Sequence, residues 1–183
     1  MNYKTRIIFT ALLVIFTAHY ASAQRTMSGQ SSLRASSLFN GRSVCAEAFY
    51  ERYTLGGYWD AGVTTNNFAL PAGNLSVKVA DLTAAGGYMH RLAATRSRSL
   101  NLYAGGGILA GAELVDPLKE IPDYISSGAK AVDFIYGIYA RLCAEWFWSQ
   151  RVGMVFHGSV PMVFNSYGSV LRWNVGAGIK IVL

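Results

Sequence analysis

The clearest pattern in this chain is a strict alternation of apolar and polar positions over its last thirteen residues. The apolar positions, spaced two apart, are Leu171, Trp173, Val175, Ala177, Ile179, Ile181 and Leu183. The positions between them, as far as residue 180, hold polar residues or glycine: Arg172, Asn174, Gly176, Gly178 and Lys180. A period of two is typical of a β-strand with one apolar face. Strands of soluble domains usually have about five or six residues, whereas a tilted strand needs roughly nine to eleven to cross a membrane. The pattern therefore predicts a membrane-spanning β-strand.

The same period predicts seven further strands. These strands cover residues 33–39, 44–53, 58–66, 77–92, 100–114, 134–148 and 152–164, and the strand at 171–183 is the eighth. Eight is an even number of strands and the smallest common size of a transmembrane barrel. We therefore predict an all-β fold, an eight-stranded antiparallel up-and-down β-barrel of outer-membrane type, with apolar side chains outside and polar ones inside.

The connections between these strands fall into two groups by length. The joints at 55–57, 93–98 and 149–150 are short, whereas those at 67–76 and 115–132 read as long loops. Short turns at one end and long loops at the other are typical of outer-membrane barrels, with the long loops outside the cell. The joint at 40–42 belongs to the second end and is short, which is a departure from this pattern.

The N-terminus has the three parts of an export signal. Lys4 and Arg6 are basic, residues 7–16 are apolar, and small residues precede a cleavage site between Ala23 and Gln24. We therefore expect a cleaved signal peptide at 1–23, a short Ser/Gly/Gln-rich tail at 24–32 and a barrel domain at 33–183.

Composition excludes a bundle of transmembrane helices. Hydrophobic residues make up 52% of the chain, yet its best candidate for a membrane helix after Ala23, residues 134–148, is interrupted by Arg141 and Glu145. Such charges are costly in a lipid-facing helix, whereas a barrel places them in its interior. The net charge of +6 is scattered, and the pair Arg96 and Arg98 reads as a solvated turn. We therefore expect no direct binding of nucleic acid.

The strand pattern turns a nearly balanced set of acids and bases toward the interior. These residues are Glu47, Glu51, Asp81, Arg91, Glu113, Arg141, Glu145, His157, Arg172 and Lys180. Buried charges persist when they are paired and hydrogen-bonded. Since eight strands leave an interior only about wide enough for side chains, we expect a structural network that fills the lumen in place of a conduit.

Other chemistry finds little support in the sequence. His157 and Ser159 share a face but lie in the middle of a strand, away from a rim where a substrate could enter. The glycines at 105–107 lie inside an alternating strand and not in a loop before a helix, which excludes a nucleotide site. No histidine or cysteine has the spacing of metal ligands. We predict no enzymatic activity, no cofactor, no bound metal and no small-molecule substrate.

The two cysteines, Cys45 and Cys143, both face the interior in this register. Export to an oxidising compartment favours a disulfide, but their strands are the second and sixth of eight and lie on opposite sides of the barrel. We therefore predict two free, buried thiols.

Several segments resemble TraO proteins, which are encoded in conjugative transposons of Bacteroides-type bacteria. They are Gln24-Arg25 after the signal, the glycine-rich 102–111, Gly128-Ala129-Lys130, the run 133–137 and the closing 175–180. The chain differs from the family pattern in its second and third strands, and it ends in Leu183 where outer-membrane barrels usually have an aromatic residue. The resemblance implies a part in conjugative transfer, with no established chemistry.

Signal, strands and resemblance together predict a non-enzymatic outer-membrane barrel that is an accessory component of a DNA-transfer apparatus. Its expected partners are outer-membrane lipid and other proteins of that apparatus. One alternative is a general outer-membrane barrel for adhesion or envelope integrity. Another is a soluble periplasmic barrel with an apolar ligand in its lumen, which would need the reverse arrangement of polar and apolar faces.

The predicted loop at 115–132 is the longest connection. Its apolar residues recur at spacings of three and four, which is typical of a short amphipathic turn: Leu118, Ile121, Tyr124 and Ile125. Long loops in compact folds are usually functional or disordered. We expect this loop to face the cell exterior and to contact partner proteins, the alternative being a solvated loop that tolerates substitution.

Overall fold

The computed structural model describes residues 28–41, 43–72, 75–115, 132–166 and 170–183. This part of the chain folds into eight β-strands. They are β1 (Ser31–Phe39), β2 (Val44–Tyr53), β3 (Gly57–Ala72), β4 (Leu75–Ala94), β5 (Leu100–Val115), β6 (Val132–Phe147), β7 (Val152–Phe164) and β8 (Asn174–Val182). The bounds of β2 and β7 are those predicted from the sequence.

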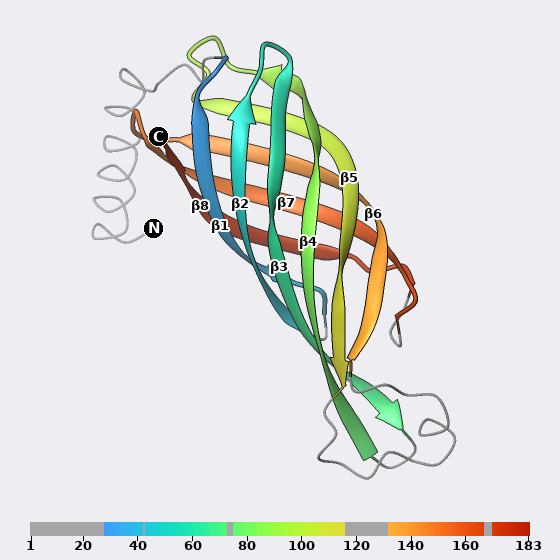
Figure 1. Cartoon of the computed structure of the whole chain (residues 1–183). Coiled ribbons are helices and arrows are strands. Elements are labelled where there is room, and N and C mark those ends of the chain that lie inside the picture. The colour runs from blue at the N-terminus through green and yellow to red at the C-terminus, as the bar shows by residue number, and fades with distance from the viewer. Residues whose placement is uncertain (1–27, 42, 73–74, 116–131, 167–169) are drawn as a thin grey trace, which may run out of the picture.

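Each strand pairs antiparallel with the next, and β8 pairs with β1, so the sheet closes into a barrel (Figure 1). The prediction of an eight-stranded antiparallel barrel is confirmed. The tight turns after β2, β4 and β6 lie at the end where the chain also terminates, here called the turn end. The opposite end, called the far end, holds the connections after β1, β3, β5 and β7.

Side chains alternate between a polar interior and an apolar exterior. Ile108 and Phe134 are 71% and 61% exposed, whereas Glu113 and Lys180 are fully buried at 0%. This arrangement is the reverse of a water-soluble barrel, which would expose its charges and bury its aliphatic side chains. It therefore argues against the alternative of a soluble barrel with an apolar lumen.

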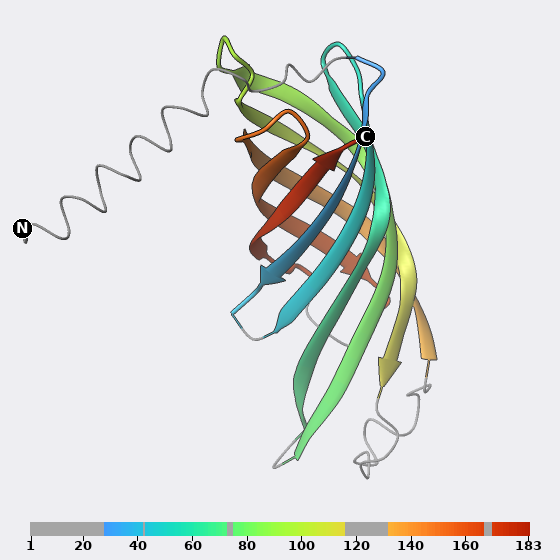
Figure 2. The same ribbon diagram turned by 90° about the vertical axis from the view of Figure 1, so that its left-hand side faces the viewer.

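The predicted loop at 67–76 was wrong, because β3 and β4 continue through most of it. Their pairing extends from Asn67 opposite Ala80 to Ala72 opposite Leu75. Here the pair runs beyond the rest of the barrel, as Figure 2 shows. Since β2 pairs with β3 only as far as Asn66, the outer edge of β3 is free of that neighbour. Pro71, which lacks an N–H group, is tolerated at such an edge.

The starts of β1 and β8 also differ from the prediction, and β3 to β6 differ by one or two residues at other boundaries. β1 begins at Ser31, so the last residues of the expected N-terminal tail belong to the barrel. β8 begins at Asn174 and not at 171, because β1 ends at Phe39 opposite Val175 and offers no partner further along. Leu171 keeps one isolated bridge to Met162 of β7.

Within the described residues, no helix has the length and hydropathy that a membrane-crossing helix requires.

Candidate functional site

The interior nearest the turn end is built around one buried lysine, and its members are here called the turn-end cluster. Lys180 of β8 forms ion pairs with Glu51 of β2 and Glu145 of β6, and all three side chains are fully buried. Its ammonium group also donates to the hydroxyl of Tyr53 at 3.1 Å, and that hydroxyl donates to Glu145 at 3.1 Å. The ammonium nitrogen lies 4.6 Å from the ring centre of Tyr58. Two carboxylates and two aromatic rings thus replace the water that the lysine loses on burial.

Aromatic and apolar side chains cover this cluster. Tyr58 packs edge-on against Tyr53 and Tyr103, with ring centres 5.5 and 4.8 Å apart. Met89 and Val155 belong to the same buried group. Because tyrosine combines a large apolar ring with a hydroxyl, it fills the barrel and still contacts charged neighbours. The turn end of the interior is therefore closed by side chains.

Two arginines and two carboxylates form a second group at mid-height, the central cluster. Arg34 of β1 lies 3.3 Å from Glu47 and 3.2 Å from Glu51, so it joins this group to the turn-end cluster. Arg141 of β6 lies 3.2 Å from Glu47 and 3.0 Å from Asp60 of β3. The result is a continuous chain of alternating acids and bases that links five of the eight strands.

Uncharged groups complete the central cluster. Both guanidinium groups lie over the ring of Phe49, at 4.7 Å for Arg34 and 4.6 Å for Arg141. The hydroxyl of Tyr139 donates to Asp60 at 3.0 Å. His157 places its Nε2 atom 3.4 Å from Glu47. Each charge in the middle of the barrel therefore has an opposite charge or an aromatic face beside it.

A third group, the far-end cluster, is centred on Arg172. This residue precedes β8 and forms an ion pair with Asp81 of β4. Its other terminal nitrogen lies 3.6 Å from Glu113 of β5 and 2.5 Å from the hydroxyl of Ser166. The guanidinium also lies 4.7 Å from the ring centre of Phe68. The irregular segment before β8 therefore places the guanidinium of Arg172 beside β4 and β5, on the other side of the barrel.

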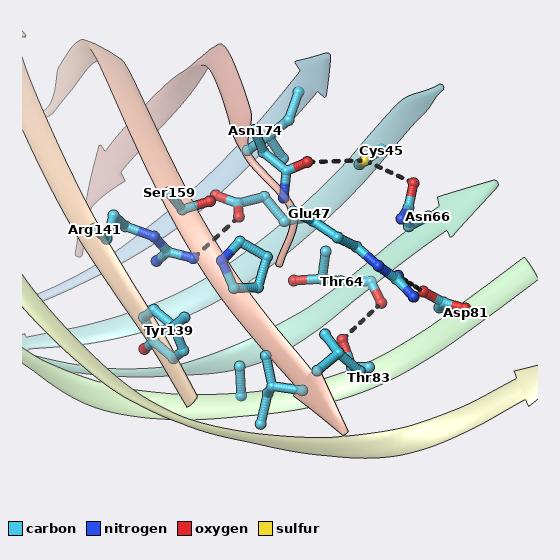
Figure 3. A pocket seen from close by; sticks show the side chains of 16 residues that line it. Cys45, Glu47, Thr64, Asn66, Asp81, Thr83, Tyr139, Arg141, Ser159 and Asn174 are labelled. Atoms are coloured by element: carbon cyan, nitrogen blue, oxygen red, sulfur yellow. Dashed lines mark hydrogen bonds and ion pairs between the residues drawn. The ribbon is translucent and has the colours of Figure 1, made fainter. Parts of the chain in front are cut away.

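A small cavity separates the central and far-end clusters. Its walls include Cys45, Asn66, Thr83 and Asn174, and the ion pair of Arg141 with Glu47 lies at one side (Figure 3). Its volume is about 60 Å³. That space suits a few water molecules, since one water needs roughly 10–15 Å³, whereas ligand sites usually have about 300–1,000 Å³. This cavity thus has no room for an organic substrate, and the described residues hold no cluster of three or more potential metal ligands.

The structure brings nine of the ten predicted interior residues into these clusters. Glu47, Glu51, Asp81, Glu113, Arg141, Glu145, His157 and Lys180 are buried, and Arg172 is half-buried. Arg91 does not join them, and that part of the prediction needs correction. A break in the pairing register of β4 with β5 follows Arg91, near the turn end of β4. The guanidinium of Arg91 donates a hydrogen bond to the main-chain carbonyl of Leu55 at 2.9 Å. Ala23, Gln24, Leu118, Ile121, Tyr124 and Ile125 lie outside the described residues.

Sequence reasoning missed two charged members of the central cluster. Arg34 lies between Ser32 and Ser36, and this spacing of two polar neighbours was a signal of an inward face. Asp60 occupies a polar position opposite Trp59, but its partner Arg141 lies three strands away and gave no local signal.

The two cysteines provide a direct test of the barrel register. Cys45 on β2 and Cys143 on β6 are both buried and free. We expect iodoacetamide, without a reducing agent, to label both thiols after heating in dodecyl sulfate and to label the folded barrel poorly. Intact-mass measurement would reveal an intramolecular disulfide, which would contradict the placement of these two strands on opposite sides.

Solved structures similar to this fold are small outer-membrane barrels. The N-terminal β-barrel domain of Pseudomonas aeruginosa OprF matches with a TM-score of 0.53 and 6% identity, covering 85% of this chain and 98% of that one. Neisserial surface protein A matches with a TM-score of 0.55 and 10% identity, covering 83% and 94%. At these identities the likeness shows the fold alone, an outer-membrane type of barrel. A search of curated proteins found no match.

The relation of this chain to a protein family comes from its sequence. A sequence profile described as "Conjugative transposon protein TraO" matches residues 23–183, which is nearly the whole chain. All of the segments that resembled TraO proteins in the sequence fall within this match. The chain belongs to the conjugative transposon protein TraO family.

Proposed function

We propose that this protein is a non-enzymatic outer-membrane barrel that serves as an accessory component of a conjugative transposon's DNA-transfer apparatus. Family membership supports the link to transfer, and the apolar exterior of the closed barrel supports a place in the membrane. The observation that carries the absence of catalysis and transport is the filled interior. Its charges are paired with one another, and its cavity of about 60 Å³ is too small for a substrate or a strand of DNA.

A barrel of this kind acts through its two ends and its wall. The cross-barrel ion pairs and the tyrosines of the turn-end cluster hold the wall rigid, so the ends of the strands stay at fixed positions. Proteins of the apparatus would then bind to these ends, while the wall anchors the complex in the outer membrane. In this proposal the barrel holds partner proteins in place and catalyses no reaction.

The location and the role in transfer require separate experiments. Fractionated cells should contain the protein in the outer membrane, and unheated samples should migrate differently from heated ones on a gel. Deletion of the gene should lower the transfer frequency of the element, and the wild-type gene on a plasmid should restore it. Unchanged transfer would refute the conjugation role, and a detergent-sensitive envelope in the deletion strain would favour a general envelope function.

We further propose that residues 115–132 contact partner proteins outside the cell. Replacing Leu118, Ile121, Tyr124 and Ile125 with serine should lower transfer while the barrel still shows its heat-dependent shift in mobility. Trypsin added to intact cells should cleave after Lys119 or Lys130, since β5 ends and β6 begins at the far end, which in this proposal faces the cell exterior. Protection of both sites until the outer membrane is permeabilised would mean that the barrel is inverted.

A further inference from the structure

The outer wall of the barrel carries an apolar groove across four adjacent strands. β8, β1, β2 and β3, which face the viewer in Figure 2, contribute two rows of paired outward-facing residues. The rows are Ile181, Leu33, Tyr50 and Ala61, and next to them Ile179, Ala35, Ala48 and Val63. Because three alanines lie among larger side chains, the surface is hollowed to a volume of about 650 Å³. This volume lies within the roughly 300–1,000 Å³ that ligand sites usually have.

An arginine stands at the end of this groove nearest the turn end. Arg52 follows Tyr50 on the same outward face of β2 and is exposed. Its guanidinium donates to Ser31 at 3.1 Å, and the hydroxyls of Ser31 and Tyr50 lie 2.6 Å apart. The ion pairs found among the described residues use other bases, so Arg52 has no carboxylate beside it there. A permanent positive charge thus faces outward at one end of the apolar groove.

Aromatic side chains show the depth at which Arg52 lies. Arg52 pairs with Trp59 of β3, and Trp59 pairs with Tyr88 of β4. The two rings pack with centres 4.9 Å apart, and Trp59 is 60% exposed. Exposed tryptophan and tyrosine of barrels gather at the boundary between hydrocarbon and headgroups. Arg52 therefore lies at the level of lipid phosphates, and the groove runs from it toward the hydrocarbon interior.

We propose that this surface binds a single phospholipid. The guanidinium of Arg52 holds the phosphodiester, for which its planar array of N–H donors is well suited. One acyl chain lies over Ala35, Ala48 and Ala61 in the groove. The positive charge of Arg52 matches the anionic headgroup of a phospholipid, and the apolar groove next to it matches an acyl chain.

Native mass spectrometry of the purified, folded barrel tests this proposal with phosphatidylglycerol as the probe. The wild-type barrel should retain phosphatidylglycerol in preference to a diacylglycerol with the same chains. Arg52→Gln, which removes the charge, and Ala48→Leu, which fills the groove, should each lower retention roughly tenfold. Arg52→Lys should have an intermediate effect, because the charge remains without the planar fork.

Matched variants separate a site from general lipid adhesion. Arg96→Gln removes an exposed arginine from the turn after β4, and Ala140→Leu enlarges an outward-facing alanine on β6. Both should retain phosphatidylglycerol as the wild type does. Equal retention by Arg52→Gln and wild type, equal loss in the matched variants, or equal binding of the diacylglycerol would overturn the proposal. Each variant is scored after its heat-dependent gel shift shows a folded barrel.

Discussion

Replacing Lys180 with methionine should destabilise the barrel by roughly 3–5 kcal/mol. The ammonium group neutralises Glu51 and Glu145, and all three side chains are fully buried. Methionine occupies a similar volume but removes the base that pairs with Glu145 among the described residues and leaves Glu51 paired with Arg34 alone. The midpoint of urea unfolding, followed by gel mobility after folding into lipid vesicles, measures the loss.

A combined variant shows whether the loss comes from the uncompensated charges. Glu51→Gln and Glu145→Gln, added to Lys180→Met, should recover much of the stability, because a neutral replacement of a buried ion pair is often close to neutral in free energy. Lys78→Met is the matched control, since Lys78 is exposed on β4 and its loss should change stability by less than about 0.5 kcal/mol. Equal urea midpoints for Lys180→Met and Lys78→Met would refute a charge-paired interior.

Replacing Gly107 with alanine should cost roughly 3 kcal/mol or prevent assembly. A methyl group on Gly107 of β5 would lie 2.1 Å from the main-chain oxygen of Gly86 and 2.6 Å from the Cα atom of Gly87, both on β4. No side chain can move aside to relieve this contact, so the two strands would have to separate. The yield of folded barrel and its urea midpoint are the measurements.

Gly158 offers a matched control for this substitution. It lies on β7, and an added methyl group would come no nearer than 3.8 Å to its neighbours. Gly158→Ala therefore tests the effect of alanine on an unfolded chain without steric strain, and it should fold as well as the wild type. Equal destabilisation by Gly107→Ala and Gly158→Ala would show that the close approach of β4 and β5 is not what Gly107 permits.

Period-two alternation predicted most of this fold because the charged residues of the strands lie mostly at inward positions and the large aliphatic residues mostly at outward ones. It located β2 and β7 to the residue and placed Glu145 and Lys180 inside. The extension of β3 and β4 was missed, because Pro71 and the glycine and asparagine that follow the strand read as a loop. Beyond Asn66, β3 pairs with β4 but not with β2, so residues typical of turns are tolerated in this part of the strand.

The pairing of interior charges could not be predicted in the same way. Lys180 meets Glu145, two strands away in the ring, and Arg141 meets Asp60, three strands away. Alternation shows which face a side chain occupies, but the height and tilt of distant strands decide which charges meet. The irregular segment that carries Arg172 to Asp81 has no period at all, and its contact depends on the closed shape of the barrel.

The cross-barrel position of the ion pairs has a kinetic consequence. Glu51 is near the start of the barrel and Lys180 near its end, so their contact closes almost the longest loop in the domain. Contacts between residues far apart in sequence form late in folding, because the entropy of loop closure must first be lost. An open sheet would thus keep Lys180 apart from Glu51 until β1 meets β8. Closure should then proceed as one cooperative step, and a barrel lacking β8 should collect as an open, protease-sensitive sheet.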